Sequence, residues 1–266
     1  MTDKLGVEER DGIAIVRFDN PPLGFIDGEM TVALDAALER LAAREDLRGI
    51  VLTGATDGVF IRHFDLGELA QMADTVAAGP PPCPARWDES IFHRITRRIE
   101  TCDVPVIAAI NGDCMGGGFE IALACDVRIA RGGPYSIGMP EMNIAMFPGA
   151  GGTVRLARLV GPALAFELLA TATVLEPAEA QRFGLVNRVA ADPLALALEL
   201  AGAMASRSRS GIAAAKRIIH ASADLSIEDA LSLEQTEVNA RLGSDEVRGV
   251  LHAYVRTATD LRKQIE

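Results

Sequence analysis

Apolar residues in the first part of the chain alternate between strand spacing and helix spacing. Residues 13–18 predict a strand that ends in a turn at Asn20-Pro21-Pro22, and residues 5–7 predict its hairpin partner. Helical spacing runs from Met30 to about Arg44, and residues 49–53 then form a short apolar run typical of a buried strand. This order of strand, helix and strand is typical of a crossover unit.

The middle of the chain continues the mixed pattern. We expect helices near 66–77 and 91–99, separated by an extended loop over the proline-rich residues 79–84. Strands are expected at 106–110 and 127–130, with a glycine-rich helix entry at 116–118 between them. The first of these strands is expected to end at Asn111-Gly112. The front of the chain is therefore predicted to be mixed α/β.

Beyond residue 152 the apolar pattern is helical almost to the end. Helices are predicted at about 153–160, 162–171, 177–183, 193–206, 211–222, 227–242 and 244–262. The back of the chain is therefore expected to be all helix.

Composition narrows the class of protein. The chain has 266 residues, of which 49% are hydrophobic and 24% charged, which excludes a disordered, collagenous or disulfide-dense chain. The formal net charge of −11 argues against partners such as nucleic acid or an anionic membrane. The charged first ten residues do not match a signal peptide, and the apolar stretches are too short for a membrane span. The four cysteines form no CxxC pair, so we expect a soluble, reduced, cytoplasmic protein without a metal site.

The first candidate for chemistry is the helix entry Gly116-Gly-Gly-Phe-Glu120. Amide groups at a helix N-terminus have no intrahelical partner, so a glycine-rich entry lets an oxygen with developing negative charge approach them. Glu120 stands one turn into that helix. A tight turn with a dipole-favoured surface glutamate explains the same spacing.

Other glycine-dependent chemistries lack their motifs. Neither 112–118 nor 149–154 completes GxGxxG, and no GK[ST] follows a glycine run. Ser136 lacks the flanking glycines of a nucleophile elbow. Dehydrogenase, kinase-like and serine-hydrolase hypotheses therefore lose their main support.

The second candidate is Glu141, in the apolar, proline-bracketed segment 139–148 that runs into Gly149-Ala-Gly-Gly152. Burial raises the pKa of a lone carboxyl group, which suits an acid or base that works near neutral pH. A solvated loop glutamate is the competing interpretation.

Taken together, these segments resemble the enoyl-CoA hydratase/isomerase (crotonase) superfamily. The resemblance covers most of the chain. Its motifs are Asn20-Pro-Pro, Ile50-Val-Leu-Thr-Gly54, the segment 105–125, Pro140-Glu141, Pro148-Gly-Ala-Gly-Gly-Thr153, Arg155-Leu156, Ala180, Gly184-Leu-Val-Asn187 and Lys216. So many matches in the right order are specific for the superfamily and not for one reaction.

The resemblance implies an α/β fold in which repeated ββα turns form a spiral. On this basis we expect a spiral core over 1–200 and a C-terminal helical region over 201–266 that is used for trimerisation. The expected assembly is a homotrimer, or a hexamer built from two trimers.

The resemblance also implies the residue roles. Main-chain amides of Phe64 and Gly117 would hold the thioester oxygen of an acyl-CoA, with Glu120 and Glu141 as acid and base on the added water. Residues expected to bind the substrate are Arg62, His63, Asp65, Gly116, Gly118 and Gly149. No metal or redox cofactor is implied, because coenzyme A arrives as part of the substrate.

Two segments depart from the family pattern. Arg62-His63 replace an Ala-Gly pair before the first donor residue, and Gly24-Phe25-Ile26 replace Asn-Ala-Leu. One hypothesis makes Arg62 a contact for a CoA phosphate and His63 a wall of the acyl pocket. The other is a rebuilt loop with solvated side chains. Arg94, Arg97 and Arg98 are further candidates for phosphate contact, or a solvated helix face.

Three functions remain open at this point. The resemblance favours hydration of a 2-enoyl-CoA to a 3-hydroxyacyl-CoA, or the reverse dehydration, as in fatty-acid and lipid metabolism, because both glutamates are present. The first alternative is an enoyl-CoA isomerase or another crotonase-type lyase on a specialised acyl-CoA. The second is a non-catalytic crotonase-fold scaffold, motivated by Arg62-His63.

Overall fold

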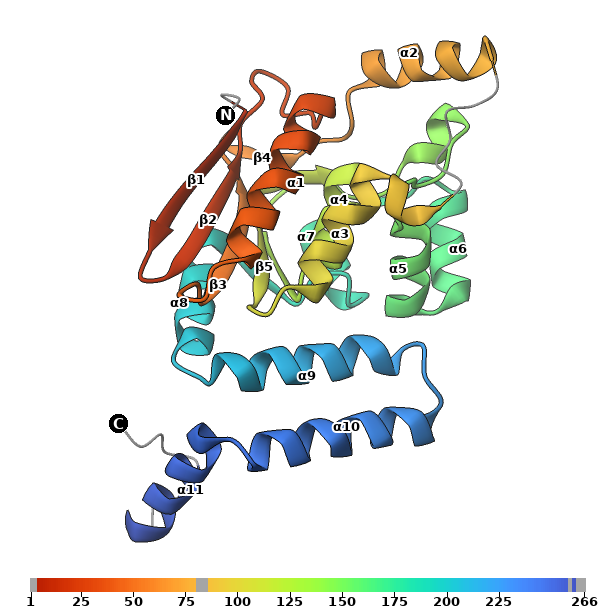
Figure 1. Ribbon diagram of the computed structural model, residues 1–266. Coiled ribbons are helices and arrows are strands. Elements are labelled where there is room, and N and C mark those ends of the chain that lie inside the picture. Colours follow the sequence, from red (N-terminus) through yellow and green to blue (C-terminus); the bar gives the residue numbers. More distant parts are fainter. Residues whose placement is uncertain (1–3, 80–85, 258–259, 262–266) are drawn as a thin grey trace. The chain divides into compact units, whose positions relative to one another are not determined.

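The computed structural model describes residues 4–79, 86–257, 260 and 261. The predicted proline-rich loop lies outside the described residues, apart from Gly79. The chain divides into two compact units, Met1–Arg209 and Ser210–Glu266. The first unit contains both sheets, and the second contains helices (Figure 1).

The first sheet runs through the centre of the first unit. Its strands, in spatial order, are β1 (Leu5–Arg10), β2 (Ile13–Phe18), β3 (Gly49–Gly54), β5 (Val106–Ile110), β7 (Val127–Arg131) and β10 (Arg188–Ala190). The β1–β2 pair is antiparallel, as the hairpin pattern predicts, and the other neighbours are parallel. Because β3 and β5 are covered on both faces, they consist of nearly continuous apolar runs.

A second, shorter sheet lies beside the first. Its strands are β4 (Gly58–Ile61), β6 (Gly112–Met115), β8 (Ile137–Gly138) and β9 (Val174–Leu175), and only the β8–β9 pair is antiparallel. Along the chain, β3–β4, β5–β6 and β7–β8 each give one strand to each sheet. The chain therefore forms the expected spiral of ββα turns.

Glycine permits the sharp corners between the two sheets. A Cβ atom on Gly54 would lie 1.9 Å from the carbonyl oxygen of Val59, and one on Gly112 would lie 1.8 Å from the carbonyl carbon of Gly58. Any side chain at these corners would displace the next strand.

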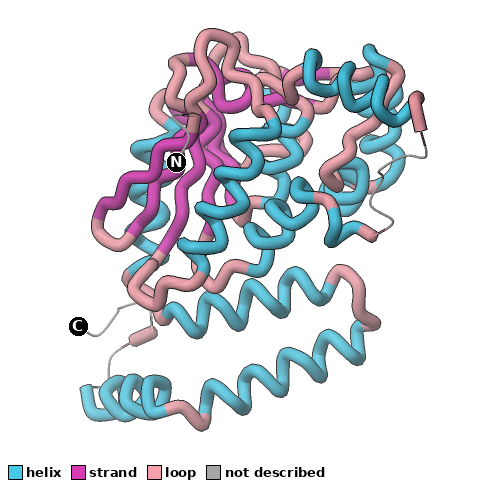
Figure 2. Tube along the Cα trace, turned by 45° about the horizontal axis from the view of Figure 1, so that its top comes forward, coloured by secondary structure: helices cyan, strands magenta, loops and turns pink. Residues whose placement is uncertain are grey.

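Helices cover both faces of the first sheet (Figure 2). Ile50 and Leu52 pack into the larger core, and Val51 points to the opposite face, where Ala197 and Ala201 cover it. The helices of this unit are α1 (Gly28–Ala42), α2 (Leu66–Ala77), α3 (Ile91–Thr101), α4 (Gly117–Ala124), α5 (Gly152–Val160), α6 (Pro162–Ala170), α7 (Pro177–Arg182) and α8 (Pro193–Ala205). Two short 3₁₀ turns accompany them, η1 (Trp87–Glu89) and η2 (Glu141–Ile144).

The second unit contains α9 (Arg209–Ser222, which starts at the last residue of the first unit), α10 (Ile227–Leu242) and α11 (Asp245–Thr257). Ser226 caps α10, where its hydroxyl accepts a hydrogen bond from the Asp229 amide. Among the described residues, no helix is both long and apolar enough to cross a bilayer.

One expectation about secondary structure is wrong. The back of the chain is not all helix, because it contributes β9 and β10 to the sheets. The strand β5 ends at Ile110, before Asn111-Gly112, as predicted, but β6, a strand that the sequence pattern did not predict, begins at Gly112 and leads into α4. These strands are two to four residues long, so they show no alternation that a sequence pattern can detect.

Candidate active site

The entry to α4 is built for close approach. Gly116 precedes the helix with φ of 51°, a left-handed value that favours glycine. A Cβ atom on Gly118 would lie 2.5 Å from the carbonyl oxygen of Ile61, so only glycine lets α4 pack this closely on β4. A Cβ atom on Gly117 would lie 3.4 Å from the ring of Phe92, so this ring borders the entry to the helix.

Glu120 lies in the first turn of α4 and is only 4% exposed. Its Oε1 accepts hydrogen bonds from the amides of Ala150 and Gly152, at 2.7 and 2.8 Å. Burial raises the pKa of this carboxyl group, although the two amides and the charge of Arg155 act in the opposite direction. A fixed carboxylate with an elevated pKa is a stronger base than an exposed one.

Arg155 supports the loop that holds Glu120. Its Nη1 donates to the carbonyl oxygen of Ala150 at 3.0 Å, and its Nε donates to Glu100 at 2.6 Å. Burial raises the pKa of Glu100, but the guanidinium groups of Arg155 and Arg97 outweigh it and leave the pKa below its ordinary value. Arg155, paired with Glu100, therefore fixes the carbonyl of Ala150, and the amide of the same residue binds Glu120.

Glu141 begins η2 and faces the entry to α4. A Cβ atom on Gly116 would lie 3.2 Å from Oε1 of Glu141, so the carboxylate lies directly against this glycine. The other oxygen, Oε2, is buried and has no hydrogen-bond partner in the described part of the chain. Burial, with a smaller contribution from the charge of Glu120, raises the pKa of Glu141 to about 7. This group therefore changes protonation state near neutral pH.

The segment that carries Phe64 is held by a short parallel ladder. Arg62 N–H donates to the Gly24 carbonyl, Ile26 N–H donates to the His63 carbonyl, and Asp65 N–H donates to the Ile26 carbonyl. Because successive peptide groups of an extended segment point to opposite sides, the N–H of Phe64 faces away from Ile26. In the described residues, neither this amide nor that of Gly117 has an acceptor.

His63 and Phe25 contact each other. Their rings stack with centroids 4.2 Å apart and an angle of 28° between the planes. His63 Nδ1 lies 2.7 Å from the carbonyl oxygen of Phe64, which accepts only, so Nδ1 carries the proton. The two segments that depart from the family pattern therefore form one contact, which fixes the residue before the candidate donor. The stack holds the His63 ring against Phe25. The segment therefore differs from the family pattern, but its His63 side chain is packed and not freely solvated.

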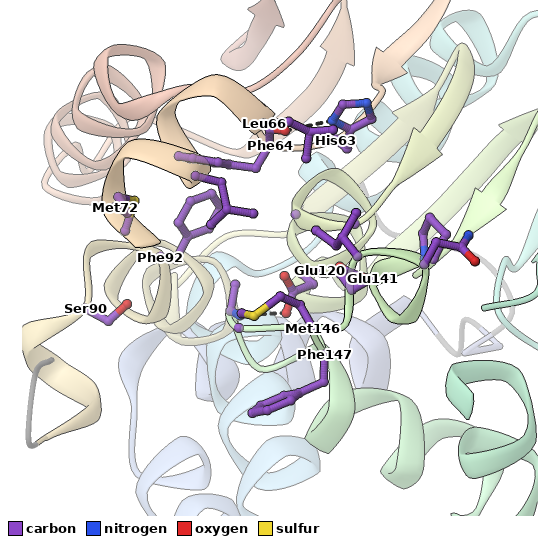
Figure 3. Close-up of a pocket in the computed structure, with 18 residues that line it drawn as sticks. His63, Phe64, Leu66, Met72, Ser90, Phe92, Glu120, Glu141, Met146 and Phe147 are labelled. Carbon is purple, nitrogen blue, oxygen red and sulfur yellow. Dashed lines mark hydrogen bonds between the residues drawn. The ribbon is translucent and has the colours of Figure 1, made fainter. Parts of the chain in front are cut away.

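A cavity of about 420 Å³ brings these groups together (Figure 3). Of the expected site residues, it is lined by His63, Phe64, Gly116, Gly117, Glu120, Glu141 and Gly149. The remaining lining comes from Leu66, Leu69, Met72, Ser90, Phe92, Pro140, Asn143, Ile144, Met146, Phe147 and Ala150. The roles of the expected residues stay predictions, but their placement in one cavity is what such roles require.

Three expected residues do not line the cavity. Gly118 packs against Ile61, and Asp65 caps α2 by accepting a hydrogen bond from the Glu68 amide at 2.9 Å. Arg62 lies 3.5 Å from Asp113 in a half-exposed ion pair. Their positions favour structural roles.

The three arginines of α3 are paired with acidic groups. Arg94 and Arg98 contact Asp35 of α1 at 3.3 and 2.7 Å, and Arg97 contacts Glu100 at 2.9 Å. These partners explain the basic cluster as helix-to-helix and intrahelical pairing.

The residues missed by sequence reasoning are Phe92 and the Arg155–Glu100 pair, together with the amides of Ala150 and Gly152. The glycine-rich run at 149–152 was the available signal for the amides. No comparable local signal marks the pair, which joins residues 55 positions apart. Within the described residues, no group of three or more His, Cys, Asp or Glu side chains is placed to hold a metal ion.

Comparison with known proteins agrees with this geometry. The sequence profile described as "Enoyl-CoA hydratase/isomerase" matches residues 8–261. The chain belongs to this family. A member of the enoyl-CoA hydratase/isomerase family is expected to act on an acyl-CoA thioester, and the donor amides and carboxylates described above fit that class of enzyme.

Curated and solved relatives span almost the whole chain. The short-chain-enoyl-CoA hydratase of Clostridium acetobutylicum is 29% identical over 252 residues, covering 94% of this chain and 93% of the relative. An enoyl-CoA hydratase structure from Bacillus anthracis is 28% identical with a TM-score of 0.86, covering 96% and 97% of the two chains. Pseudomonas aeruginosa DspI is 27% identical with a TM-score of 0.85, covering 96% and 95%. These similarities establish the crotonase fold.

Proposed function

We propose that this protein adds water across the C2=C3 double bond of a 2-enoyl-CoA, forming a 3-hydroxyacyl-CoA, and catalyses the reverse dehydration. The observation that carries this proposal is one cavity lined by two carboxyl groups with raised pKa values and by two residues, Phe64 and Gly117, whose amides have no acceptor among the described residues. The relatives described as enoyl-CoA hydratases support the same reaction.

The amides of Phe64 and Gly117 are assigned to the thioester oxygen. When water adds at C3, electrons move through C2 onto this oxygen and form an enolate. Preorganised N–H donors stabilise such a charge, and the loss of one donor in a comparable site costs about 10²–10³ in rate. Gly117 also benefits from the positive end of the α4 dipole.

Glu120 is assigned as the base that takes a proton from water. Its Oε1 is occupied by two amides, which favours the ionised form, and its burial keeps the group basic. The oxygen of the water forms the new bond to C3 as its proton passes to Glu120.

Glu141 is assigned as the acid that supplies a proton to C2. With a pKa of about 7, a large fraction of this group is protonated at neutral pH, and its Oε2 has no competing partner in the described residues. Protonation of C2 returns the electrons from the enolate and completes the addition of one water molecule. Proton exchange between the two carboxyl groups and solvent then restores the starting states.

The test is the loss of conjugated thioester absorbance when crotonyl-CoA and longer 2-enoyl-CoA substrates are mixed with the protein. The expected result is turnover by the unaltered protein and a loss of about 10²–10⁴ in kcat for Glu141→Gln. Turnover no faster than in Glu141→Gln, for every chain length, would refute the hydratase proposal.

Product analysis separates hydration from isomerisation. The hydratase proposal predicts a 3-hydroxyacyl-CoA whose new oxygen comes from labelled water. Turnover of a 3-enoyl-CoA without any hydroxyacyl product would instead assign the protein to the isomerases of the family.

A further inference from the structure

We propose that the acyl group of the substrate is an uncharged, apolar chain longer than four carbons. This inference rests on the proposed function and specifies the substrate class of the same cavity. The observations that carry it are the position and chemistry of the cavity lining.

An aromatic wall stands directly beside the two candidate donors. The rings of Phe64 and Phe92 pack edge to face with centroids 5.8 Å apart. The ring of Phe92 also borders the space beside Gly117, 3.4 Å from where a Cβ atom on this glycine would lie. A thioester bound to both amides therefore places its carbon chain against these rings.

Helix α2 extends the apolar surface away from the donors. Leu66, Leu69 and Met72 line the cavity, yet α2 has no buried residue, and Met72 is 56% exposed. Figure 3 shows Met72 and Phe92 to one side of the two glutamates. An apolar helix face that borders a reactive centre is stabilised when a ligand chain covers it.

The loop after Glu141 supplies a further apolar side. Ile144, Met146 and Phe147 line the cavity, and Phe147 is 63% exposed. These side chains surround the same space as α2, so an alkyl chain would remove apolar surface on both sides from water at once. A longer chain therefore covers more of this apolar surface than a chain of four carbons does.

The charges of the lining exclude an acidic acyl group. The described lining contains the carboxyl groups of Glu120 and Glu141 and no Lys or Arg side chain. A carboxylate at the end of the acyl chain would be desolvated without a cation to pair with it. The substrate chain is therefore uncharged.

Calorimetry with saturated acyl-CoA esters tests this inference without requiring turnover. Decanoyl-CoA is expected to bind at least about tenfold more tightly than butyryl-CoA, because each buried methylene adds favourable transfer energy. Adipyl-CoA is expected to bind at least about tenfold more weakly than hexanoyl-CoA of the same chain length. Equal or tighter binding of butyryl-CoA, or of adipyl-CoA, would overturn the inference.

A matched pair of variants locates the effect on α2. Met72→Glu places a charge on the exposed cavity wall and is expected to reduce the preference for decanoyl-CoA over butyryl-CoA at least about fivefold. Val76→Glu adds the same charge one turn further along the same helix, is 41% exposed in the unaltered chain and does not line the cavity. This control is expected to leave the preference unchanged.

The remaining outcomes separate this inference from the proposed function. Tight binding of decanoyl-CoA without hydration of any 2-enoyl-CoA would refute the hydratase proposal and retain the inference about the acyl group. Hydration with equal efficiency at all chain lengths would retain the hydratase and refute the inference. If Met72→Glu instead weakened both esters equally and changed the sedimentation of the protein, a second copy of the chain would cover α2, and the inference would fall.

Discussion

The two halves of the candidate site are held in different ways, although each contributes one amide and one carboxyl group. Gly117 and Glu120 belong to α4, in which every residue is buried. Phe64 and Glu141 lie on short segments, a four-residue stretch paired with residues 24–26 and a 3₁₀ turn that leads into exposed residues. We refer to these as the fixed half and the adjustable half.

The difference indicates which part of the site can vary within the fold. A change in α4 alters the core, because Gly118 touches Ile61 and Glu120 binds the loop that begins α5. The segment around Phe64 is stabilised locally, by a ladder and one aromatic stack, so its residues can be exchanged as a group. The departures from the family pattern, Phe25 and His63, both lie in the adjustable half.

The largest expected effect comes from the carboxyl group of the fixed half. Glu120→Gln keeps an oxygen that accepts from Ala150 and Gly152 but removes the base, so we expect kcat with a 2-enoyl-CoA to fall by about 10²–10⁴. The thermal unfolding midpoint should not fall, which a melting curve checks. A loss below about tenfold would mean that the fixed half does not supply the base.

Removal of the support behind Glu120 should have the next largest effect. Arg155→Met frees the Ala150 carbonyl and leaves Glu100 without its closest cation, so we expect kcat/KM to fall by about 10–100-fold. Because the charge of Arg155 lowers the pKa of Glu120, its loss should also move the acidic limb of the pH profile to higher pH.

Arg158→Met on the same helix is the control, since Arg158 is exposed and lies outside the cavity lining. An equal loss in both variants, or an unshifted acidic limb in Arg155→Met, would show that Arg155 acts only on folding.

Glu141, the carboxyl group of the adjustable half, is expected to destabilise the folded state when it is ionised at high pH. The pKa of Glu141 is about 7 in the fold, above its ordinary value of 4.5, so the folded state loses stability as pH rises through this interval. Glu141→Gln stays neutral and should raise the free energy of unfolding by about 1–3 kcal/mol above pH 8, with little gain below pH 4.5. Urea unfolding at several pH values measures this, and a gain independent of pH would contradict it.

The smallest expected effect tests the stack between Phe25 and His63. Phe25→Ala and His63→Gly should each lower kcat by about 2–10-fold, because an aromatic pair contributes about 0.5–1.5 kcal/mol. The double variant should be little worse than the more damaging single variant, since the same contact is lost once. Phe166→Ala, which changes an exposed aromatic residue of α6 outside the cavity, should leave kcat unchanged. Fully additive losses would show that the two rings act independently.

The sequence predicted the first sheet better than the second, for a physical reason. Strands β2, β3 and β5 have five or six residues and long apolar runs, because they are covered by the core. The second sheet uses segments such as Gly112–Met115 and Ile137–Gly138, which contain glycine and polar residues and are stabilised by pairing with distant strands. No local pattern encodes that pairing.

The same distinction applies to the site. Glu120 and Glu141 stand in local motifs, so the sequence alone identified them as candidates, and both lie in the cavity. The contact between Phe25 and His63 joins two segments far apart in the chain, and so does the pair of Glu100 and Arg155. Such contacts form only when the spiral brings their segments together, so no local sequence pattern predicts them.

Because Nδ1 of His63 is hydrogen-bonded to the Phe64 carbonyl, the other ring nitrogen, Nε2, is the one left for a ligand in the cavity that His63 lines. Nitrogen-15 spectra of an imidazole in a single tautomer show two widely separated signals, and the chain has only four histidines. The nitrogen-15 signals of isotope-labelled histidine would therefore report ligand binding next to His63, even in variants that no longer catalyse turnover.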